Sequence, residues 1–364
     1  MSAIRSVRLY RLEVPLRVPY KLAFGPVGQF DTLIAQIEDS DGRAGLGEAT
    51  ILTGYTEETV DGSWALMQRL ARSAVGVEAE EACRRLLSEV QRAPFAVTAL
   101  VTAVEMLQGN RFLAVPVASE VPLLALVNGE TAGALDAEID ALLERGFRTL
   151  KVKVGFEVEA DARRLRLIQR IAAGRATIRV DANQGYSVDD ARRFASGMQP
   201  DGIELFEQPC RAGDWEAATA VAAVSTVPMM LDESIYGIED IERAAELRAA
   251  RFIKLKLMKL GSVERLVGAL ELIRALGMEP VLGNGVACEI GCWMEALVAR
   301  THIHNAGEMN GYLKQAETLL VDPPEFSRGA MRLEPDYRPQ LDPGALQRLA
   351  RDTARFLPSA FARA

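Results

Sequence analysis

The sequence predicts an α/β protein built around a barrel of eight parallel strands, and three observations support this fold. Short apolar runs of strand length recur about every 25 residues between positions 122 and 305. Amphipathic helical segments such as DAEIDALLERG and VERLVGALELIRALG lie between them. Strands that alternate with helices favour parallel pairing, and eight such units in about 200 residues match a (β/α)₈ barrel.

Each barrel strand is expected in one apolar run bounded by turn residues or by a helical segment. The first run is PLLALVN and the last is THIHN, which contains both histidines of the chain. The eight predicted strands are 122–128, 149–155, 177–183, 202–209, 227–234, 251–259, 279–285 and 301–305.

The first third of the chain follows a different pattern and predicts a separate α+β domain over residues 1–115. Its first half contains stretches of alternating polarity, and turn residues at 39–42 predict a hairpin. Strands followed by helices are typical of an α+β unit. The predicted strands are 4–14, 31–38 and 43–50, and the predicted helices are 56–74, 79–91 and 94–109. The barrel is assigned to 116–330 and a C-terminal segment to 331–364, with a helix at 343–357.

Composition excludes several classes of protein. The net charge of −8, with no block of basic residues, argues against a nucleic-acid surface. No uninterrupted apolar run reaches 18 residues and no signal peptide is visible, so we expect a cytoplasmic protein without a membrane span. Four scattered cysteines predict free buried thiols, and two histidines are too few for a His-rich zinc site.

Two lysines occupy an otherwise apolar strand in TLKVKVG. Alternate residues of a barrel strand point inward, so Lys151 and Lys153 are expected to share the interior near the carboxyl end of the strand. Active sites of this fold lie at that end. Two neighbouring ammonium groups in a dry interior repel each other, so acids are expected close to them.

Three acids end the next three predicted strands at the spacing of the barrel repeat. Asp181 lies in RVDANQGY, Glu207 in LFEQP and Asp232 in MLDES. Residues one repeat apart at strand ends converge on the barrel mouth. Three carboxylates without His or Cys suit Mg²⁺. Each acid alone is also explained as a helix cap or as the partner of a surface arginine.

The sixth predicted strand, FIKLKLMKLG, carries three more lysines. Lys254 and Lys256 alternate with apolar residues, which predicts that they share one face. If that face is inward, Lys256 lies across the barrel from Lys153; the alternative is structural pairing with Asp232 or Glu233. Lys259 is expected to be solvated or to cap the next helix.

These motifs, taken in order, resemble the enolase superfamily and, within it, the muconate lactonizing enzyme subgroup. The resemblance is carried by KVK at 151–153, DAN at 181–183, EQP at 207–209, DES at 232–234 and KLMKLG at 256–261. It implies a modified (β/α)₇β barrel with an N-terminal capping domain, to which the C-terminal segment returns.

The resemblance also implies a role for each matched residue. Asp181, Glu207 and Asp232 become Mg²⁺ ligands, and Lys153 and Lys256 become acid/base catalysts on opposite faces of the substrate α-carbon. Lys151 becomes the neighbour that lowers the pKa of Lys153 and helps neutralise the substrate carboxylate.

Further residues are expected to contact the substrate. Asn183 lies in DAN, and Glu308 follows the eighth predicted strand and resembles an acidic residue that some members hold there. Tyr20, Phe24 and Tyr55 lie in two capping loops, 20–30 and 51–58, where packing is the other explanation of each aromatic residue.

The chemistry implied is Mg²⁺-dependent removal of a proton α to a carboxylate through an enediolate. The favoured reaction is racemisation or epimerisation of an amino-acid derivative such as an N-acyl amino acid, by a homo-oligomer acting on a small carboxylate. Alternatives are a lactonizing cycloisomerase, a dehydratase or o-succinylbenzoate synthase-type elimination, and a noncatalytic metal-binding barrel. Dipeptide epimerases resemble one another in an Asp-x-Asp pair after strand eight, whereas this chain has GEMN at 307–310.

Overall fold

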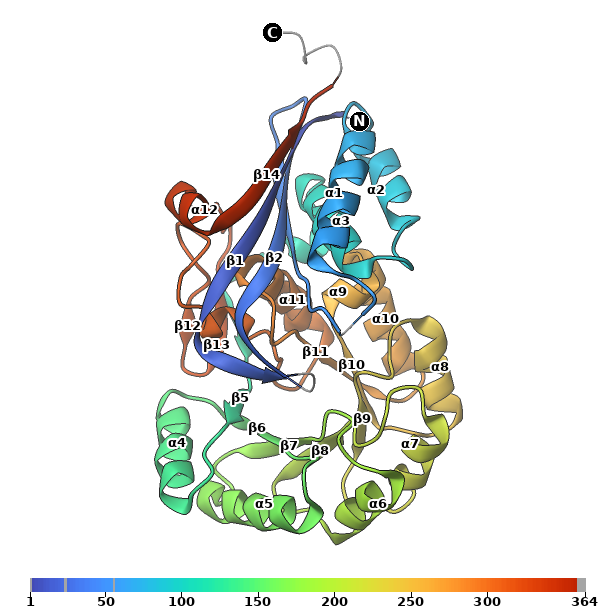
Figure 1. The fold of residues 1–364 in the computed structure, drawn as a ribbon, viewed down its shortest axis with the longest axis vertical. Helices are drawn as coiled ribbons and strands as arrows, with labels where there is room; N and C mark the ends of the chain where they lie inside the picture. Colours follow the sequence, from blue (N-terminus) through green and yellow to red (C-terminus); the bar gives the residue numbers. More distant parts are fainter. Residues whose placement is uncertain (1, 23–24, 55, 359–364) are drawn as a thin grey trace.

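The computed structural model describes residues 2–22, 25–54 and 56–358, apart from the side chains of Lys21 and Leu22 (Figure 1). An antiparallel sheet flanked by three helices lies above a barrel of parallel strands, and outer helices α4 to α8 surround the lower side of that barrel. Phe24 and Tyr55, expected at the substrate, lie outside the described residues.

The antiparallel sheet has the order β14-β1-β2-β3. Its strands are β1 Ile4–Leu22, β2 Gly25–Asp39, β3 Ala44–Thr50 and β14 Ala350–Phe356. The hairpin turn lies at 39–42, where Gly42 has φ +83°. The helix predicted at 343–357 is wrong in its second half: α12 ends at Leu349, and the chain continues as β14. The free edge of β1 supplies hydrogen-bond partners from Val7 to Leu12, which outweighs local helix propensity.

Three helices, α1 Val60–Ala74, α2 Ala79–Leu87 and α3 Pro94–Leu107, lie beside this sheet. α3 is buried on almost every side and packs against β2 and β3. Its close approach requires glycine on β3, because a Cβ at Gly45 would lie 2.0 Å from the carbonyl oxygen of Ala103. A Cβ at Gly47 would lie equally close to the carbonyl oxygen of Ala99, at 2.0 Å. Any side chain at either position would therefore push the helix away.

Seven parallel strands form the barrel wall in the order β11-β10-β9-β8-β7-β6-β5. They are β5 Ala125–Val127, β6 Thr149–Lys153, β7 Thr177–Asp181, β8 Ile203–Glu207, β9 Met229–Leu231, β10 Phe252–Leu255 and β11 Glu279–Leu282. The parallel bridge between Leu123 and Gly307, with the bond from Glu308 N to Leu282 O, closes the wall between β11 and β5. The predicted α/β fold, a modified TIM barrel, is confirmed.

Helices follow the strands around the outside of the barrel. They are α4 Ala132–Glu144, α5 Val158–Ala172, α6 Val188–Gly197, α7 Trp215–Ala222, α8 Ile238–Glu246, α9 Leu257–Leu260, α10 Val263–Ala275 and α11 Glu289–His302. A small sheet of β4 Ser119–Pro122, β12 Phe326–Ser327 and β13 Ala330–Leu333 lies beside them, with 3₁₀ turns at Arg111–Leu113 and Gly311–Lys314.

Two predicted barrel strands differ from the structure. The eighth predicted strand, 301–305, is wrong, because His302 ends α11. The closing stave of the barrel, its eighth strand position, is the short extended segment around Gly307. The sixth ends early, because β10 stops at Leu255 and Leu257–Leu260 turn into a helix. Both predictions rest on a short apolar run, and such a run is compatible with a strand or with a helix.

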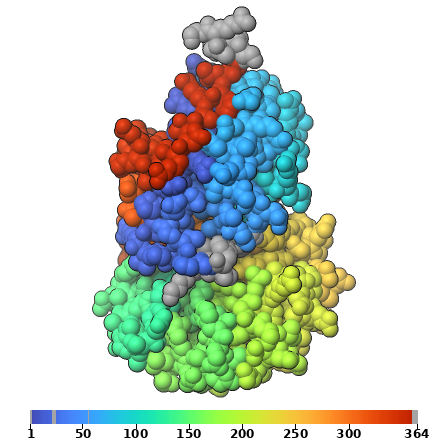
Figure 2. Space-filling view, in the orientation of Figure 1, coloured from blue at the N-terminus to red at the C-terminus, as the bar shows by residue number. Residues whose placement is uncertain are grey.

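Buried glutamates of the N-terminal part join it to the barrel helices. Glu48, on β3, accepts backbone hydrogen bonds from Ile290 at 2.9 Å and Gly291 at 3.0 Å, in the first turn of α11. Glu105, on α3, accepts from Val263 N at 2.8 Å and from Ser262 Oγ at 2.6 Å, where α10 begins. The first N–H groups of a helix have no partner within the helix, and they favour a negatively charged acceptor. These contacts therefore hold the N-terminal part against the barrel helices. In Figure 2 the blue N-terminal part lies directly above the green and yellow barrel part.

In the part of the chain that the structure describes, no helix has both the length and the apolar character that crossing a membrane requires.

Candidate active site

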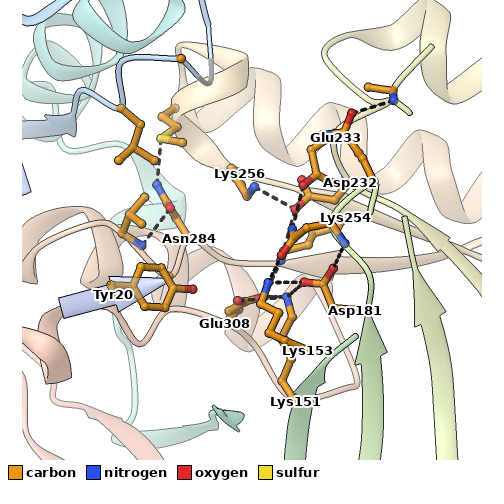
Figure 3. A pocket seen from close by; sticks show the side chains of 18 of the residues that line it. Tyr20, Lys151, Lys153, Asp181, Asp232, Glu233, Lys254, Lys256, Asn284 and Glu308 are labelled. Carbon is orange, nitrogen blue, oxygen red and sulfur yellow. Dashed lines mark hydrogen bonds and ion pairs between the residues drawn. The ribbon is translucent and has the colours of Figure 1, made fainter. Parts of the chain in front are cut away.

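A cavity of about 290 Å³ opens at the carboxyl ends of the barrel strands, beneath the antiparallel sheet. Below it, Leu205, Met230 and Val281 pack together and fill the barrel interior. Charged side chains that point toward one another line much of the cavity, as Figure 3 shows. The predicted residues that line it are Tyr20, Lys151, Lys153, Asp181, Asn183, Asp232, Lys256 and Glu308.

Strand register places the first functional side chains at one height. Lys153 pairs with Asp181 across β6 and β7, and Asp181 pairs with Glu207 across β7 and β8. Parallel strands in register present equivalent side chains to the same side. The loop that follows β6 can pass close to the next one only because Gly155, with φ +96°, has no side chain; a Cβ there would lie 2.5 Å from the carbonyl oxygen of Ala182.

Lys151 is buried among carboxylates, and its side chain is 2% exposed. Its Nζ lies 2.8 Å from Asp181, 2.8 Å from Glu207 and 3.0 Å from Glu308. Burial alone would lower the pKa of Lys151, but the three carboxylates outweigh it and raise that pKa above its usual value. Lys151 is therefore a fixed positive charge at the centre of the acids.

Lys153 reaches further into the cavity, and its side chain is 24% exposed. Its Nζ lies 2.7 Å from Asp181 and also donates to Asn183 Oδ1. Asn183, in the left-handed region at φ +40°, donates in turn to Glu233 at 2.8 Å. Burial lowers the pKa of Lys153 and Lys151 lowers it further, but Asp181 reverses the sign, so the net shift is upward. The lowered pKa expected of a base therefore does not hold while Asp181 is paired with this lysine.

Lys254 lies between two of the predicted metal ligands. Its Nζ is 3.1 Å from Glu207 Oε1 and 3.4 Å from Asp232 Oδ2, and it forms a close ion pair with Glu308. The side chain is 3% exposed. Burial opposes its charge, but the surrounding acids, Glu207 first, raise the pKa of Lys254 well above its usual value.

Asp232 contacts two further lysines. Lys256, the N-cap residue of α9, lies 2.8 Å from Asp232 Oδ2, and Lys259 lies 3.0 Å from Oδ1. Lys259 is buried and also donates to the carbonyl oxygens of Asp232 and Ile235, so the expectation of a solvated or capping lysine is wrong. Burial lowers the pKa of Lys259 to about 8.

The acids themselves titrate differently. Burial, followed by the charge of Asp181, raises the pKa of Glu207 to about 7. Burial would also raise that of Asp181, but Lys151 and Lys153 bring it down to about 2. One atom of Glu207, Oε2, lies 2.8 Å from Lys151 yet has no aligned hydrogen bond to any described residue.

The donor set suits Mg²⁺, because it consists of carboxylate oxygens only. Within 2–22, 25–54 and 56–358, however, no three His, Cys, Asp or Glu side chains lie close enough to hold an ion as they stand. Asp181 Oδ2 and Glu207 Oε2 share Lys151 at 2.8 Å each, so they are no more than about 5.6 Å apart. Glu207 Oε1 and Asp232 Oδ2 share Lys254 at 3.1 and 3.4 Å, so they are within about 6.5 Å. Ligands of one Mg²⁺ are at most about 4 Å apart, so these two pairs of acids would need to approach by at most about 2.5 Å to share an ion.

The remaining wall comes from the capping side and from the last barrel loops. The ring of Tyr20 on β1 lies 4.4 Å from Lys314 Nζ, which also donates to Asn310 Oδ1 at 2.8 Å. A Cβ at Gly285 would be 3.3 Å from the Tyr20 hydroxyl and 3.2 Å from Lys314 Nζ. Glycine at this position keeps that corner of the cavity open.

Sequence reasoning missed Glu233, Asn284 and Lys314 as parts of this site, and it assigned Lys259 elsewhere. One compositional signal was available. Only seven of the 42 basic residues are lysine, and the other 35 are arginine. The six lysines with described side chains all line the cavity or touch a residue that does; they are Lys151, Lys153, Lys254, Lys256, Lys259 and Lys314.

Comparison with known proteins is consistent with this geometry. Residues 4–112 match the mandelate racemase/muconate lactonizing enzyme N-terminal domain, and residues 134–344 match the enolase C-terminal domain-like model. An L-Ala-D/L-Glu epimerase of Clostridium acetobutylicum is 30% identical over 320 residues, which are 82% of this chain and 84% of the relative.

Two further similarities involve other reactions. An N-succinyl-L-Arg/Lys racemase of Bacillus cereus is 24% identical over 311 residues, 81% of each chain. The crystal structure of muconate lactonizing enzyme from Pseudomonas fluorescens with muconolactone superposes with a TM-score of 0.86 and 26% identity, covering 96% of this chain and all of the other. The chain therefore belongs to the mandelate racemase/muconate lactonizing enzyme family of the enolase superfamily and is an enzyme of the isomerase class.

Proposed function

We propose that the chain racemises or epimerises an amino-acid derivative such as an N-acyl amino acid. One lysine removes the proton α to the substrate carboxylate, and another delivers a proton to the opposite face. The observation that carries this proposal is the placement of Lys153 and Lys256. They stand on β6 and directly after β10, and β7, β8 and β9 lie between those strands. Strands four positions apart in an eight-stranded barrel lie directly opposite each other across the cavity.

Other residues of the site are assigned supporting roles. Lys151 provides a permanent positive charge for the substrate carboxylate, because its pKa is held high by three acids. Asn183 orients Lys153 through the hydrogen bond that its Oδ1 accepts. Tyr20 covers the cavity from the capping side, and Phe24 and Tyr55 remain predicted contacts.

Asp181, Glu207 and Asp232 are proposed to hold Mg²⁺. When bound, the ion stabilises negative charge on the substrate carboxylate oxygens as the α-proton leaves. Orientation and the timing of proton transfer then depend on the lysines of this chain.

The ion pairs of Glu308 with two lysines favour an N-acyl substrate over a dipeptide. A dipeptide brings an ammonium group that needs an acid for recognition, and no Asp-x-Asp pair follows the closing stave. Glu308 is 4% exposed and already paired with Lys151 and Lys254. An uncharged amide avoids placing another cation beside these two lysines. The N-succinyl-L-Arg/Lys racemase is a relative with such a substrate.

A cycloisomerase or a syn-elimination enzyme is the second candidate. It is favoured by the structural similarity to muconate lactonizing enzyme. Such a reaction uses mainly one of the two lysines, whereas racemisation requires both.

Incubation in D₂O with Mg²⁺ separates these functions. We would test N-succinyl and N-acetyl amino acids, dipeptides and cis,cis-muconate, and follow ¹H NMR, polarimetry and ultraviolet absorbance. A racemase incorporates deuterium at the α-carbon and generates the enantiomer. Deuterium in the dipeptides alone would overturn the N-acyl assignment. A change in conjugation without α-exchange would favour the cycloisomerase or elimination reaction.

We also propose that the enzyme works as a cytoplasmic homo-oligomer on a small carboxylate, with a capping unit at 1–115, a barrel at 116–330 and a returning segment at 331–364. Light scattering after size exclusion measures the assembly, and a single-chain mass would contradict it.

A further inference from the structure

We propose that Lys254 is an internal competitor of the divalent cation, and that Glu308 receives its ammonium group when the cation binds. This inference rests on the proposed function, because it concerns the same three carboxylates. It assigns Lys254 a role that the metal ligands and the two acid/base lysines do not fill.

The first argument is position. Lys254 Nζ contacts Glu207 Oε1 at 3.1 Å and Asp232 Oδ2 at 3.4 Å, and these two acids are expected to bind one ion together. The ammonium group bridges the two oxygens that would turn toward the ion. It cannot keep both contacts while both oxygens turn to a metal ion.

The second argument is charge. An ammonium group and a divalent cation within a few ångströms of each other repel strongly in a buried site. The side chain of Lys254 is only 3% exposed, so water screens this repulsion poorly. The apparent affinity for the cation is therefore reduced by the free energy needed to move Lys254.

The third argument is that Lys254 has somewhere to go. Glu308 forms the closest of its ion pairs and is not one of the expected metal ligands. Lys254 has four bonds along a flexible side chain, so a small rotation keeps Glu308 while it releases Glu207 and Asp232. Glu308 thus keeps a buried cation paired, which makes the displacement possible.

Metal-binding measurements on the full chain test this arrangement. We would titrate Mg²⁺ by calorimetry, and Mn²⁺ by electron paramagnetic resonance, into the wild type, Lys254→Met and Lys254→Ser. Both substitutions remove the charge, and we expect the affinity to rise by about tenfold or more. Glu308→Gln should lower the affinity, and Lys254→Met should gain more in that background than in the wild type, because Lys254 then has only the metal ligands as partners.

Lys259→Met is the matched control. It removes a buried charge that touches one of the expected metal ligands, Asp232, through the other oxygen, at 3.0 Å. A smaller gain in Lys259→Met than in Lys254→Met supports direct competition. Equal gains in both variants would overturn it in favour of a general effect of charge.

A measurement on the wild type covers the case in which the variants do not fold. With only seven lysines, protein labelled with [ε-¹³C]lysine has few side-chain signals. Mg²⁺ should shift the Lys254 signal and leave it paired with Glu308. An unshifted Lys254 signal in protein that binds Mg²⁺ would overturn the inference alone. Absence of binding in every variant would overturn the magnesium site of the proposed function as well.

Discussion

Lys153 and Lys256 are each paired with a different aspartate on facing sides of one cavity. Lys153 Nζ lies 2.7 Å from Asp181, and Lys256 Nζ lies 2.8 Å from Asp232. The two amines therefore line one cavity and pair with different aspartates. Each can be changed while the pairing of the other is preserved, which makes their roles separable by experiment.

Replacing either lysine should abolish racemisation but leave half of the exchange chemistry. In Lys153→Met, we expect racemisation to fall about 10²- to 10⁴-fold, the range of a general acid/base contribution. Lys256 should still exchange the α-proton of one enantiomer in D₂O, as followed by ¹H NMR. Lys256→Met should show the reverse enantiomer preference, so each variant serves as the control of the other. Equal exchange of both enantiomers in either variant contradicts two-face catalysis.

Removal of divalent cations should inactivate the enzyme reversibly. After dialysis against a chelator, we expect no α-exchange, and Mg²⁺ should restore it. Mg²⁺ should also raise the melting temperature, because a ligand that binds only the folded state stabilises it. Glu207→Gln loses one donor charge and should show a much smaller rise. Full exchange in chelated protein, with metal content checked by mass spectrometry, would refute the requirement for metal.

Glu48 should make stability fall as pH rises. Burial raises the pKa of Glu48 from 4.5 to about 7, so the folded protein holds the carboxyl proton of Glu48 more tightly than the unfolded chain does. The stabilisation that this protonated carboxyl gives the folded state is complete below pH 4.5 and is lost as pH rises through 7. The free energy of unfolding falls by about 3 kcal/mol over that range. Urea unfolding of wild type and Glu48→Gln from pH 5 to 8 measures this. The difference in free energy between the two proteins should change in favour of the variant; a constant difference would contradict the assignment.

Glu105 should stabilise the junction between α3 and α10. Glu105→Ala leaves the N–H of Val263 and the hydroxyl of Ser262 without their acceptor, so we expect a loss of about 2 kcal/mol in the free energy of unfolding. Glu80→Ala, at an exposed position on α2, should change it by less than about 0.5 kcal/mol. Chemical denaturation compares them, and similar losses in both variants would exclude a specific role for Glu105.

The barrel and the placement of its acids could be predicted because both depend on local signals. The apolar runs are short and regularly spaced, and a residue at the end of a parallel strand must lie at the barrel mouth. Asp181 and Glu207 are therefore aligned by register alone. The contacts of Lys151 with Asp181 and Glu207 follow from the same rule.

Other features depend on partners far away in the chain. Glu48 meets Ile290 from 242 residues away, and Glu105 meets Ser262 from 157 residues away, so neither contact leaves a local pattern. β14 forms because β1 offers an open edge, which the sequence of 350–356 does not reveal. Lys259 was misplaced because residues 257–260 form one helical turn, in which it follows Lys256 by three positions on the same side.

The concentration of lysine at the cavity has a practical consequence for chemical modification. Arginine accounts for 35 of the 42 basic residues, and guanidinium groups do not react with amine-directed acylating reagents under mild conditions. Of the five lysines that pair with the acids, Lys153 is the most accessible at 24% exposed, so a reagent that enters the cavity would meet it first. Immobilisation through surface carboxyl groups avoids the cavity lysines, and protection of Lys153 against acylation by a bound carboxylate would serve as an assay of occupancy.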